Sequence, residues 1–179
     1  MSRLTTTIKI ASVVIGLGAV SFGALVYRQA HPPLPPGLAT LAGTHLSTAQ
    51  GSPILLGQAA APATTTIVSF WATWCIPCRD EARALAALRQ RYSPRDLAIV
   101  YLNVDETPNP AAMTKFLQAT HATALRALYA GHAGWTTITG TKIMVLPRTY
   151  VFDRTGAAQA VLAGFDGAKL DDSVSAAMR

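Results

Sequence analysis

Apolar and polar residues change their spacing several times along this chain, and each change predicts a different element. Thr64 to Ala72 is a run of β-branched and aromatic residues, typical of a buried strand that ends near Trp71. From Cys78 to Tyr92 the apolar residues recur at helical spacing, and Ser93-Pro94 ends the predicted helix. Leu97 to Asp105 predicts a second buried strand. These segments predict a strand, helix and strand in succession.

The second half of the chain continues the alternation. Pro110 suits the first turn of a helix, so we expect a helix to begin there. Residues 148–153 and 158–165 predict an antiparallel strand pair joined by a turn at Arg154-Thr155-Gly156. Residues 168–178 predict a closing helix.

Three other segments complete the prediction. Two short β-compatible runs within residues 44–56 surround a Gln50-Gly51-Ser52 turn and predict a hairpin. Residues 124–130 fit a strand or a helix equally well, and residues 135–142 are too rich in threonine, and too interrupted by glycine, for an assignment. Strands that alternate with helices and end in a hairpin indicate an α/β domain with a mixed sheet.

The N-terminus predicts a membrane segment. Arg3 and Lys9 precede an apolar run from Ile10 to Val26, which favours a retained signal anchor with a cytoplasmic N-terminus over a cleaved signal peptide. The proline-rich stretch that follows favours an extended spacer of roughly 20 Å. We therefore predict an anchor at 1–28, a linker at 29–37 and one exported domain at 38–179.

Composition agrees with one domain and argues against a polyanion partner. The chain has 179 residues, half of them hydrophobic, which is enough for a single core. Of its 15 basic residues, three lie within the first thirty, and the remaining 12 face 9 acidic ones. No run of Lys and Arg with interleaved aromatic residues occurs, so we expect no nucleic-acid partner.

The chain has two cysteines, Cys75 and Cys78, spaced as C-x-x-C between a predicted strand and a predicted helix. Free N–H groups and the dipole at a helix N-terminus favour the thiolate of Cys75 and lower its pKa. The thiolate is the attacking form, so Cys75 is the predicted nucleophile and Cys78, one turn further on, the resolving thiol. Pro77 between them suits a helix start.

Other uses of the cysteine pair fit less well. A structural disulfide across so short a loop would remove little chain entropy. The four histidines show no spacing that would complete a zinc site. A Cu(I) site made by the two thiolates, with Met144 as a further ligand, stays open. We expect no bound cofactor and no resident metal.

The segment "SFWATWCIPCRDE", with "VLPRTYVFD" further on, resembles the thioredoxin superfamily, and in particular its membrane-tethered, exported TlpA/ResA-like branch of thiol-disulfide oxidoreductases. The resemblance implies a thioredoxin fold: a mixed central sheet flanked by helices, here with an N-terminal hairpin added. It implies that Pro147 is a cis-proline facing the cysteines, with Leu146 offering its backbone to a substrate. Trp74, Ile76 and Pro77 then belong to the substrate-binding surface.

Glu81 matches the active-site acid of this branch. Three residues after Cys78, its carboxylate lies one turn along the same side of the predicted helix and could relay a proton to or from a thiol. The alternative is a solvent-facing carboxylate that only suits the helix dipole.

Three departures from the family pattern bear on this site. Ser69 stands where thioredoxin has a buried aspartate, which removes that proton relay and gives Glu81 more weight. Arg83 stands where the branch has a proline, so a helix kink is not expected. The run "TTITGTKIMVLP" before the cis-proline also diverges, so partner recognition is expected to differ from that of other members.

The function expected from the resemblance is disulfide exchange with partner proteins, in the reducing direction, as in cytochrome c maturation. Electrons would come from a membrane protein, and the domain would lie in the periplasm of a bacterium, tethered to the inner membrane or released by cleavage. The alternatives are a DsbA-like oxidase or isomerase, a Cu(I)-handling protein, and a binding module that makes no use of its cysteines.

Overall fold

The computed structural model describes residues 27, 32–60 and 64–179. The chain divides into two compact units, Met1–Pro33 and Leu34–Arg179, and the second holds every strand described below. The predicted anchor from Ile10 to Val26 lies outside the described residues and stays a prediction. Among the residues that are described, no helix is long and apolar enough to cross a membrane.

A seven-stranded mixed sheet forms the centre of the second unit, in the order β2-β1-β5-β4-β3-β6-β7. Strands β3, β4 and β5 are parallel to one another, and the other neighbouring strands are antiparallel. The strands are β1 His45–Ser47, β2 Pro53–Leu55, β3 Thr65–Trp71, β4 Leu97–Asn103, β5 Arg126–Tyr129, β6 Arg148–Phe152 and β7 Ala158–Ala163.

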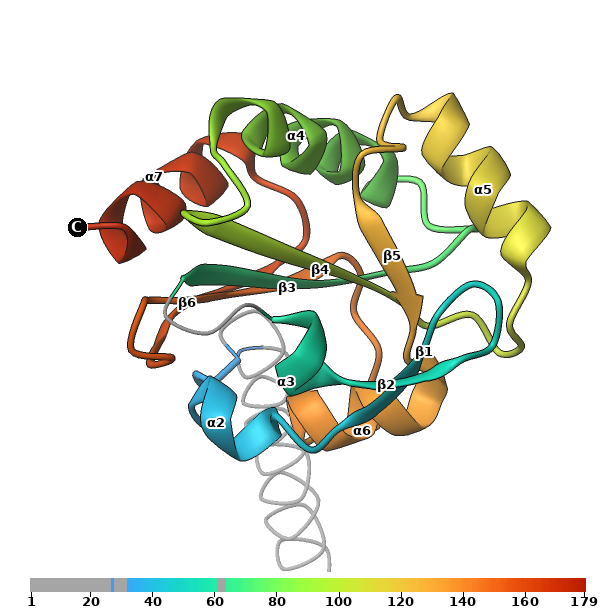
Figure 1. Cartoon of the computed structure of the whole chain (residues 1–179), viewed down its shortest axis with the longest axis horizontal. Coiled ribbons are helices and arrows are strands. Elements are labelled where there is room, and N and C mark those ends of the chain that lie inside the picture. Colours follow the sequence, from blue (N-terminus) through green and yellow to red (C-terminus); the bar gives the residue numbers. More distant parts are fainter. Residues whose placement is uncertain (1–26, 28–31, 61–63) are drawn as a thin grey trace, which may run out of the picture. The chain divides into compact units, whose positions relative to one another are not determined.

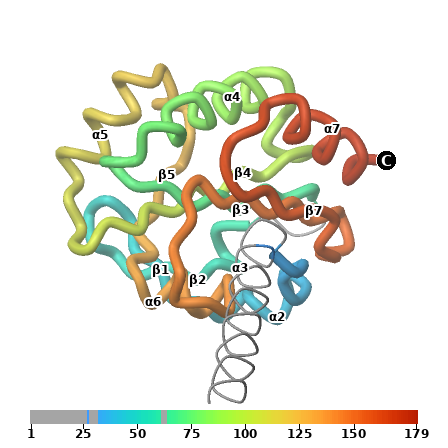
Figure 2. The backbone as a smooth tube through the Cα atoms, turned by 180° about the vertical axis from the view of Figure 1, so that it is seen from behind, coloured from blue at the N-terminus to red at the C-terminus, as the bar shows by residue number. Residues whose placement is uncertain are grey.

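Helices cover both faces of the sheet. Helices α4, α5 and α7 lie on one side and α2, α3 and α6 on the other, as the front view and the view from behind both show (Figures 1 and 2). Their bounds are α2 Leu38–Leu41, α3 Leu56–Ala59, α4 Cys78–Arg91, α5 Pro110–Ala119, α6 Gly131–Thr139 and α7 Gly167–Ala177. Because both faces are covered, every residue of the central strands β3 and β4 is buried, which explains their unbroken apolar runs.

The elements predicted from the periodicity are confirmed. The hairpin within 44–56, the two buried strands, the helices beginning near Cys78 and Pro110, the C-terminal strand pair and the last helix are all present. Residues 124–130, which fitted two structures, contain strand β5, because pairing with β4 decides the conformation. The predicted mixed sheet flanked by helices, with an N-terminal hairpin, is therefore confirmed.

Helix α6 is the element that the sequence left unassigned. The hydroxyls of Thr136 and Thr139 donate to the carbonyls of His132 and Trp135, four residues earlier, so these threonines bond within the helix rather than competing with it. Gly140 ends the helix with a positive φ of 68°. Trp135 is fully buried and packs edge-on against Phe70 of β3, which holds the helix to the sheet.

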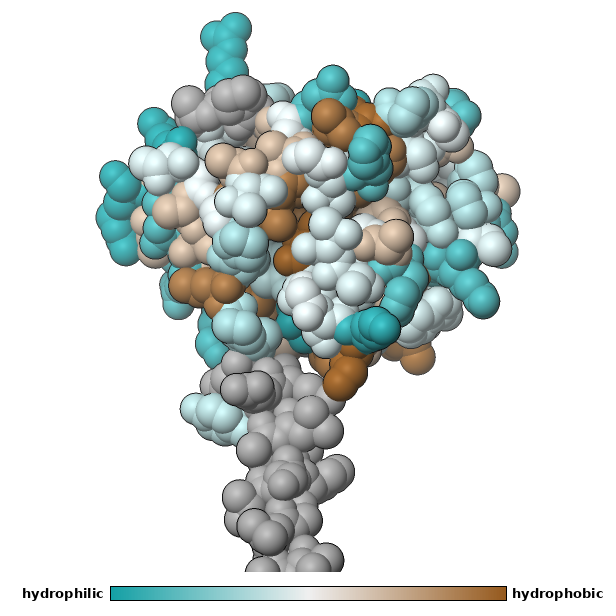
Figure 3. Space-filling view, turned by 90° about the horizontal axis from the view of Figure 1, so that it is seen from below, coloured by the Kyte–Doolittle hydropathy of each residue, from teal (hydrophilic) through white to brown (hydrophobic). Residues whose placement is uncertain are grey.

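The face seen from below carries its apolar side chains in separate patches among polar ones (Figure 3). Over the described residues, the large apolar side chains that are exposed include two, Trp74 and Ile76, that lie beside a cysteine in the sequence.

Candidate active site

The two cysteines form a disulfide at the start of α4, with their Cα atoms 5.4 Å apart. Cys78 is the first residue of the helix, as the periodicity predicts, and Cys75 lies three residues before it in the turn that joins β3 to the helix. The backbone N–H of Cys78 donates to the Sγ of Cys75 at 3.3 Å. This is one of the free N–H groups at the helix start, and it would stabilise a thiolate on Cys75.

Exposure differs around the two sulfur atoms. Cys75 is 4% exposed and Cys78 is fully buried, so Cys75 is the more accessible of the pair. The side chains of Trp74 and Ile76 on either side of Cys75 are 66% and 78% exposed. Pro77 is exposed as well. The predicted substrate-binding residues of this segment thus form an apolar rim around the accessible sulfur.

The second predicted part of the site lies at the start of β6. The Leu146-Pro147 peptide bond is cis, Pro147 is buried and Leu146 is half-buried. Arg148, the next residue, pairs with Phe70 near the end of β3. The cis-proline therefore lies at the same end of the strands as the turn that carries the cysteines.

Glu81 is buried, with 2% of its surface exposed, and the solvent-facing alternative is wrong. The hydroxyl of Ser69 donates to its Oε2 at 2.8 Å, and the hydroxyl of Thr149 donates to its Oε1. Burial raises the pKa of Glu81 to about 7, although both hydrogen bonds oppose the rise by stabilising the charged form. A carboxyl group with this pKa can both release and accept a proton near neutral pH.

Three polar residues form a row across the sheet beneath α4. Thr149 of β6 is paired with Ser69 of β3, and Ser69 is paired with Tyr101 of β4, so their side chains point to the same face. All three are buried. Tyr101 donates from its hydroxyl to the backbone carbonyl of Cys78 at 3.4 Å, and burial, followed by the charge of Glu81, raises the Tyr101 pKa.

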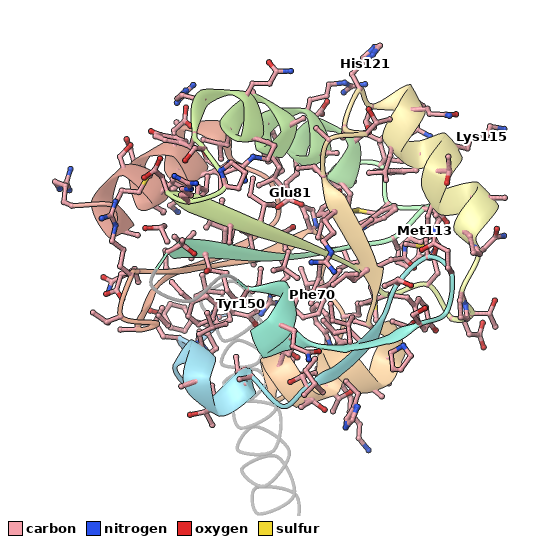
Figure 4. The ribbon with its side chains drawn as sticks, in the orientation of Figure 1. Phe70, Glu81, Met113, Lys115, His121 and Tyr150 are labelled. Carbon is pink, nitrogen blue, oxygen red and sulfur yellow. A yellow bond between two sulfur atoms is a disulfide. The ribbon has the colours of Figure 1, made fainter. Side chains whose placement is uncertain are left out.

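This polar row links Glu81 to Cys78. Two of its members hold the carboxyl group and the third holds the carbonyl of Cys78, and Figure 4 shows Glu81 between α4 and the strands below. In the sequence, Ser69 stands out only as a departure from thioredoxin, and the roles of Thr149 and Tyr101 were not predicted. Polar residues within apolar strands were the available signal, but the strand register was needed to align them.

A second polar contact fixes the turn before the cysteines. The carboxylate of Asp105 accepts hydrogen bonds from the backbone N–H of Thr73 at 3.0 Å and from the side chain of Asn103 at 3.1 Å. The N–H of Val104 donates to the carbonyl of Trp71 at 2.9 Å. The ends of β3 and β4 are thus tied together just before the cysteine turn, and no local pattern in the sequence predicts this role for Asp105.

The remaining expectations concern α4 and metals. Helix α4 runs without interruption from Cys78 to Arg91, in keeping with Arg83 in place of a proline. Met144, the further ligand considered for Cu(I), packs half-buried against the core. Within the described part of the chain, no group of three His, Cys, Asp or Glu side chains could hold a metal ion.

Comparison with known proteins agrees with this fold. The family model described as Redoxin matches residues 36–175. A thioredoxin of Synechocystis is 44% identical over 46 residues, which cover 26% of this chain and 42% of that protein. The thioredoxin-like protein YneN of Bacillus subtilis is 28% identical over 101 residues, 55% of either chain. The chain thus matches only about half the length of these relatives.

Among solved structures, a secreted Mycobacterium tuberculosis disulfide oxidoreductase homologous to E. coli DsbE superposes with a TM-score of 0.62. The two chains are 16% identical, and the match covers 76% of this chain and 98% of that one. At this identity the likeness concerns the fold.

The fold is that of thioredoxin, and it carries a C-x-x-C disulfide at the start of its first long helix, as expected from the sequence. The chain belongs to the Redoxin family.

The buried carboxyl group makes the stability of the protein depend on pH. Between pH 4.5 and about 7 the folded state keeps the Glu81 proton that the unfolded state has released, so its stabilising effect is complete below pH 4.5 and is lost as pH rises through about 7. We expect the unfolding free energy to fall by about 3 kcal/mol relative to that of Glu81→Gln between about pH 4 and pH 8. Urea unfolding of both proteins across this pH range measures the difference in unfolding free energy. Parallel pH profiles of the two proteins would contradict the prediction.

The Thr149 hydroxyl is predicted to set the pKa of Glu81. Thr149→Val keeps the shape of the side chain but removes the donor, so the Glu81 pKa should rise above about 7, whereas Thr149→Ser should keep it there. Glu81 and Glu106 are the only glutamates of the sequence, so carbon-13 NMR of labelled glutamate carboxyls resolves the titration with Glu106 as internal control. Identical Glu81 titrations in the three proteins would exclude this role.

Proposed function

We propose that this protein exchanges disulfides with partner proteins through Cys75 and Cys78. The observation that carries the proposal is the disulfide itself, closed at a helix start with the more accessible sulfur accepting the N–H of Cys78. An apolar rim of Trp74 and Ile76 around that sulfur suits the backbone and apolar side chains of a protein substrate.

The reaction in the reducing direction has two steps. The Cys75 thiolate attacks one sulfur of the partner's disulfide, forming a mixed disulfide and releasing one partner thiol. Cys78 then loses its proton and attacks the Sγ of Cys75, which regenerates the intramolecular disulfide and releases the second partner thiol. Two electrons pass from the dithiol to the partner, and a donor must reduce the protein before the next cycle.

Glu81 serves in this scheme as the acceptor of the Cys78 proton. Its pKa of about 7 leaves a large share of the carboxyl groups ionised at neutral pH and ready to take a proton. In the reverse reaction the protonated form returns it. The polar row of Ser69, Thr149 and Tyr101 keeps the carboxyl group and the start of α4 in register for this transfer.

We further propose that the domain acts outside the cytoplasm, tethered by residues 10–26 to the bacterial inner membrane, and reduces its partners with electrons from a membrane protein. Support comes from the basic and apolar pattern of the N-terminus and from the likeness to a secreted disulfide oxidoreductase. Reduction of apocytochrome c cysteines before haem attachment is the partner reaction that this setting suggests.

The reduction potential of the Cys75/Cys78 couple tests the direction. We expect about −270 mV, the value of thioredoxin, when the full chain in a non-ionic detergent is equilibrated with a thiol redox buffer. A value near about −120 mV, that of DsbA, would make the protein an oxidant and would exclude the reducing role.

Single cysteine variants test the order of attack. Cys78→Ser should trap a partner as a stable mixed disulfide on Cys75, because no resolving thiol remains, whereas Cys75→Ser should trap none and should lose exchange. Mass spectrometry after incubation with a disulfide-bonded protein identifies the adduct. Trapping by Cys75→Ser instead would reverse the two roles.

A further inference from the structure

A hollow of about 330 Å³ opens beside the disulfide, between the start of α4 and helix α5. Its lining consists of Thr73, Arg79, Ala112, Lys115, Phe116 and Ala119. Thr73 stands two residues before Cys75, and Arg79 directly follows Cys78. A substrate bound at Cys75 would therefore have this hollow next to its chain.

The rim of the hollow is cationic. Arg79 and Lys115 are both exposed, and Figure 4 shows Lys115 on the outer side of α5 while Met113 faces inward. Within the described residues neither takes part in an ion pair, and no acidic side chain lines the hollow. The nearby carboxylate of Asp105 is buried and accepts from the N–H of Thr73 and from Asn103.

The other arginines of α4 have partners. Arg83 pairs with Asp80 at 2.5 Å, and Arg91 approaches Asp171 at 3.4 Å. Arg89 donates to the backbone carbonyl of Leu97 at 2.6 Å. Among the arginines of α4, Arg79 is therefore the one available to pair with a negative charge on a substrate.

The floor of the hollow is apolar. Phe116 is buried there, and Ala112 and Ala119 leave space on the same face of α5. Methylene groups fit against such a floor while a carboxylate meets the guanidinium and ammonium groups at the rim. Glutamate and aspartate side chains have this combination of a short apolar stem and a negative end.

We propose that the hollow selects protein disulfides that carry acidic side chains within a few residues of the attacked cysteine. The proposal rests on the function proposed above and names the chemistry of its substrates. Opposite charges at a docking site raise association rates about 10- to 1,000-fold at low salt, so selection acts on the rate of encounter.

Matched peptide disulfides test the selection. Three peptides differ only in two residues next to the cysteine, which are Glu, Gln or Lys, and the fluorescence of the reduced full-length chain in non-ionic detergent reports its oxidation in a stopped-flow instrument. We expect the Glu peptide to react about tenfold faster than the Gln peptide at about 10 mM salt, and the advantage to disappear near 1 M, where screening acts within about 3 Å. The Lys peptide should be the slowest.

Two double variants separate the hollow from the overall charge. Arg79→Gln with Lys115→Gln should bring the Glu and Gln peptides to equal rates. The control, Arg95→Gln with Arg154→Gln, removes the same charge from two exposed residues. These residues lie at the other ends of the strands, before β4 and after β6. The control should keep the faster reaction of the Glu peptide. Because Arg79 adjoins Cys78, the ratio of the two rates within each protein is compared, which cancels any change in thiol reactivity.

Each outcome decides the proposal. Equal rates of the Glu and Gln peptides in the unaltered chain, or an advantage that survives in the Arg79/Lys115 variant, would overturn it. Loss of the advantage in both double variants would assign it to net charge and overturn it equally. Reduction of the peptides tests the proposed function separately. A chain that reduces none of the three peptides fails as a disulfide reductase, whatever its charge preference.

Discussion

The buried carboxyl group of Glu81 joins helix α4 to the centre of the sheet. A carboxyl group away from water is costly unless it is hydrogen-bonded, and here the hydroxyls of Ser69 and Thr149 supply both bonds. Those hydroxyls can meet it only because β3 and β6 pair in one register, which aligns them with Tyr101 of β4. A shift of β6 against β3 by one residue would turn Thr149 to the other face and break the row. The position of α4 over the sheet, and with it the place of Cys78, depends on this contact.

The site combines a turn held in place by hydrogen bonds with Cys75, the more accessible of the two cysteines. The turn before the cysteines is held by the carboxylate of Asp105 and by the hydrogen bond from Val104 to Trp71. Cys78 is held as the first residue of α4. The polar groups that support Cys75 are thus already hydrogen-bonded in the disulfide form. The surface around the sulfur, where the exposed rim and the cationic hollow lie, can then vary without disturbing the polar row beneath it.

Much of this could be predicted from residues that act locally. The apolar runs of β3 and β4, the proline that begins α5 and the C-x-x-C pair between strand and helix carry their own signals, since burial, backbone restriction and sulfur chemistry depend on neighbours in sequence. Segments without such a signal were decided by contacts. Residues 126–129 became a strand by pairing with β4, and α6 is held to the sheet by Trp135 against Phe70.

By itself the sequence determined the order of most elements, the class of the domain and the place of its cysteine pair between a strand and a helix, while β5 and α6 stayed open. It left Glu81 with two environments, because a residue three positions after Cys78 can face water or the sheet with the same helical spacing. Only the tertiary structure decided between them, by laying α4 across β3, β4 and β6 and bringing together residues as far apart as Ser69 and Thr149. Hydrogen bonds between strands fix such distant neighbours, and no local pattern encodes their register.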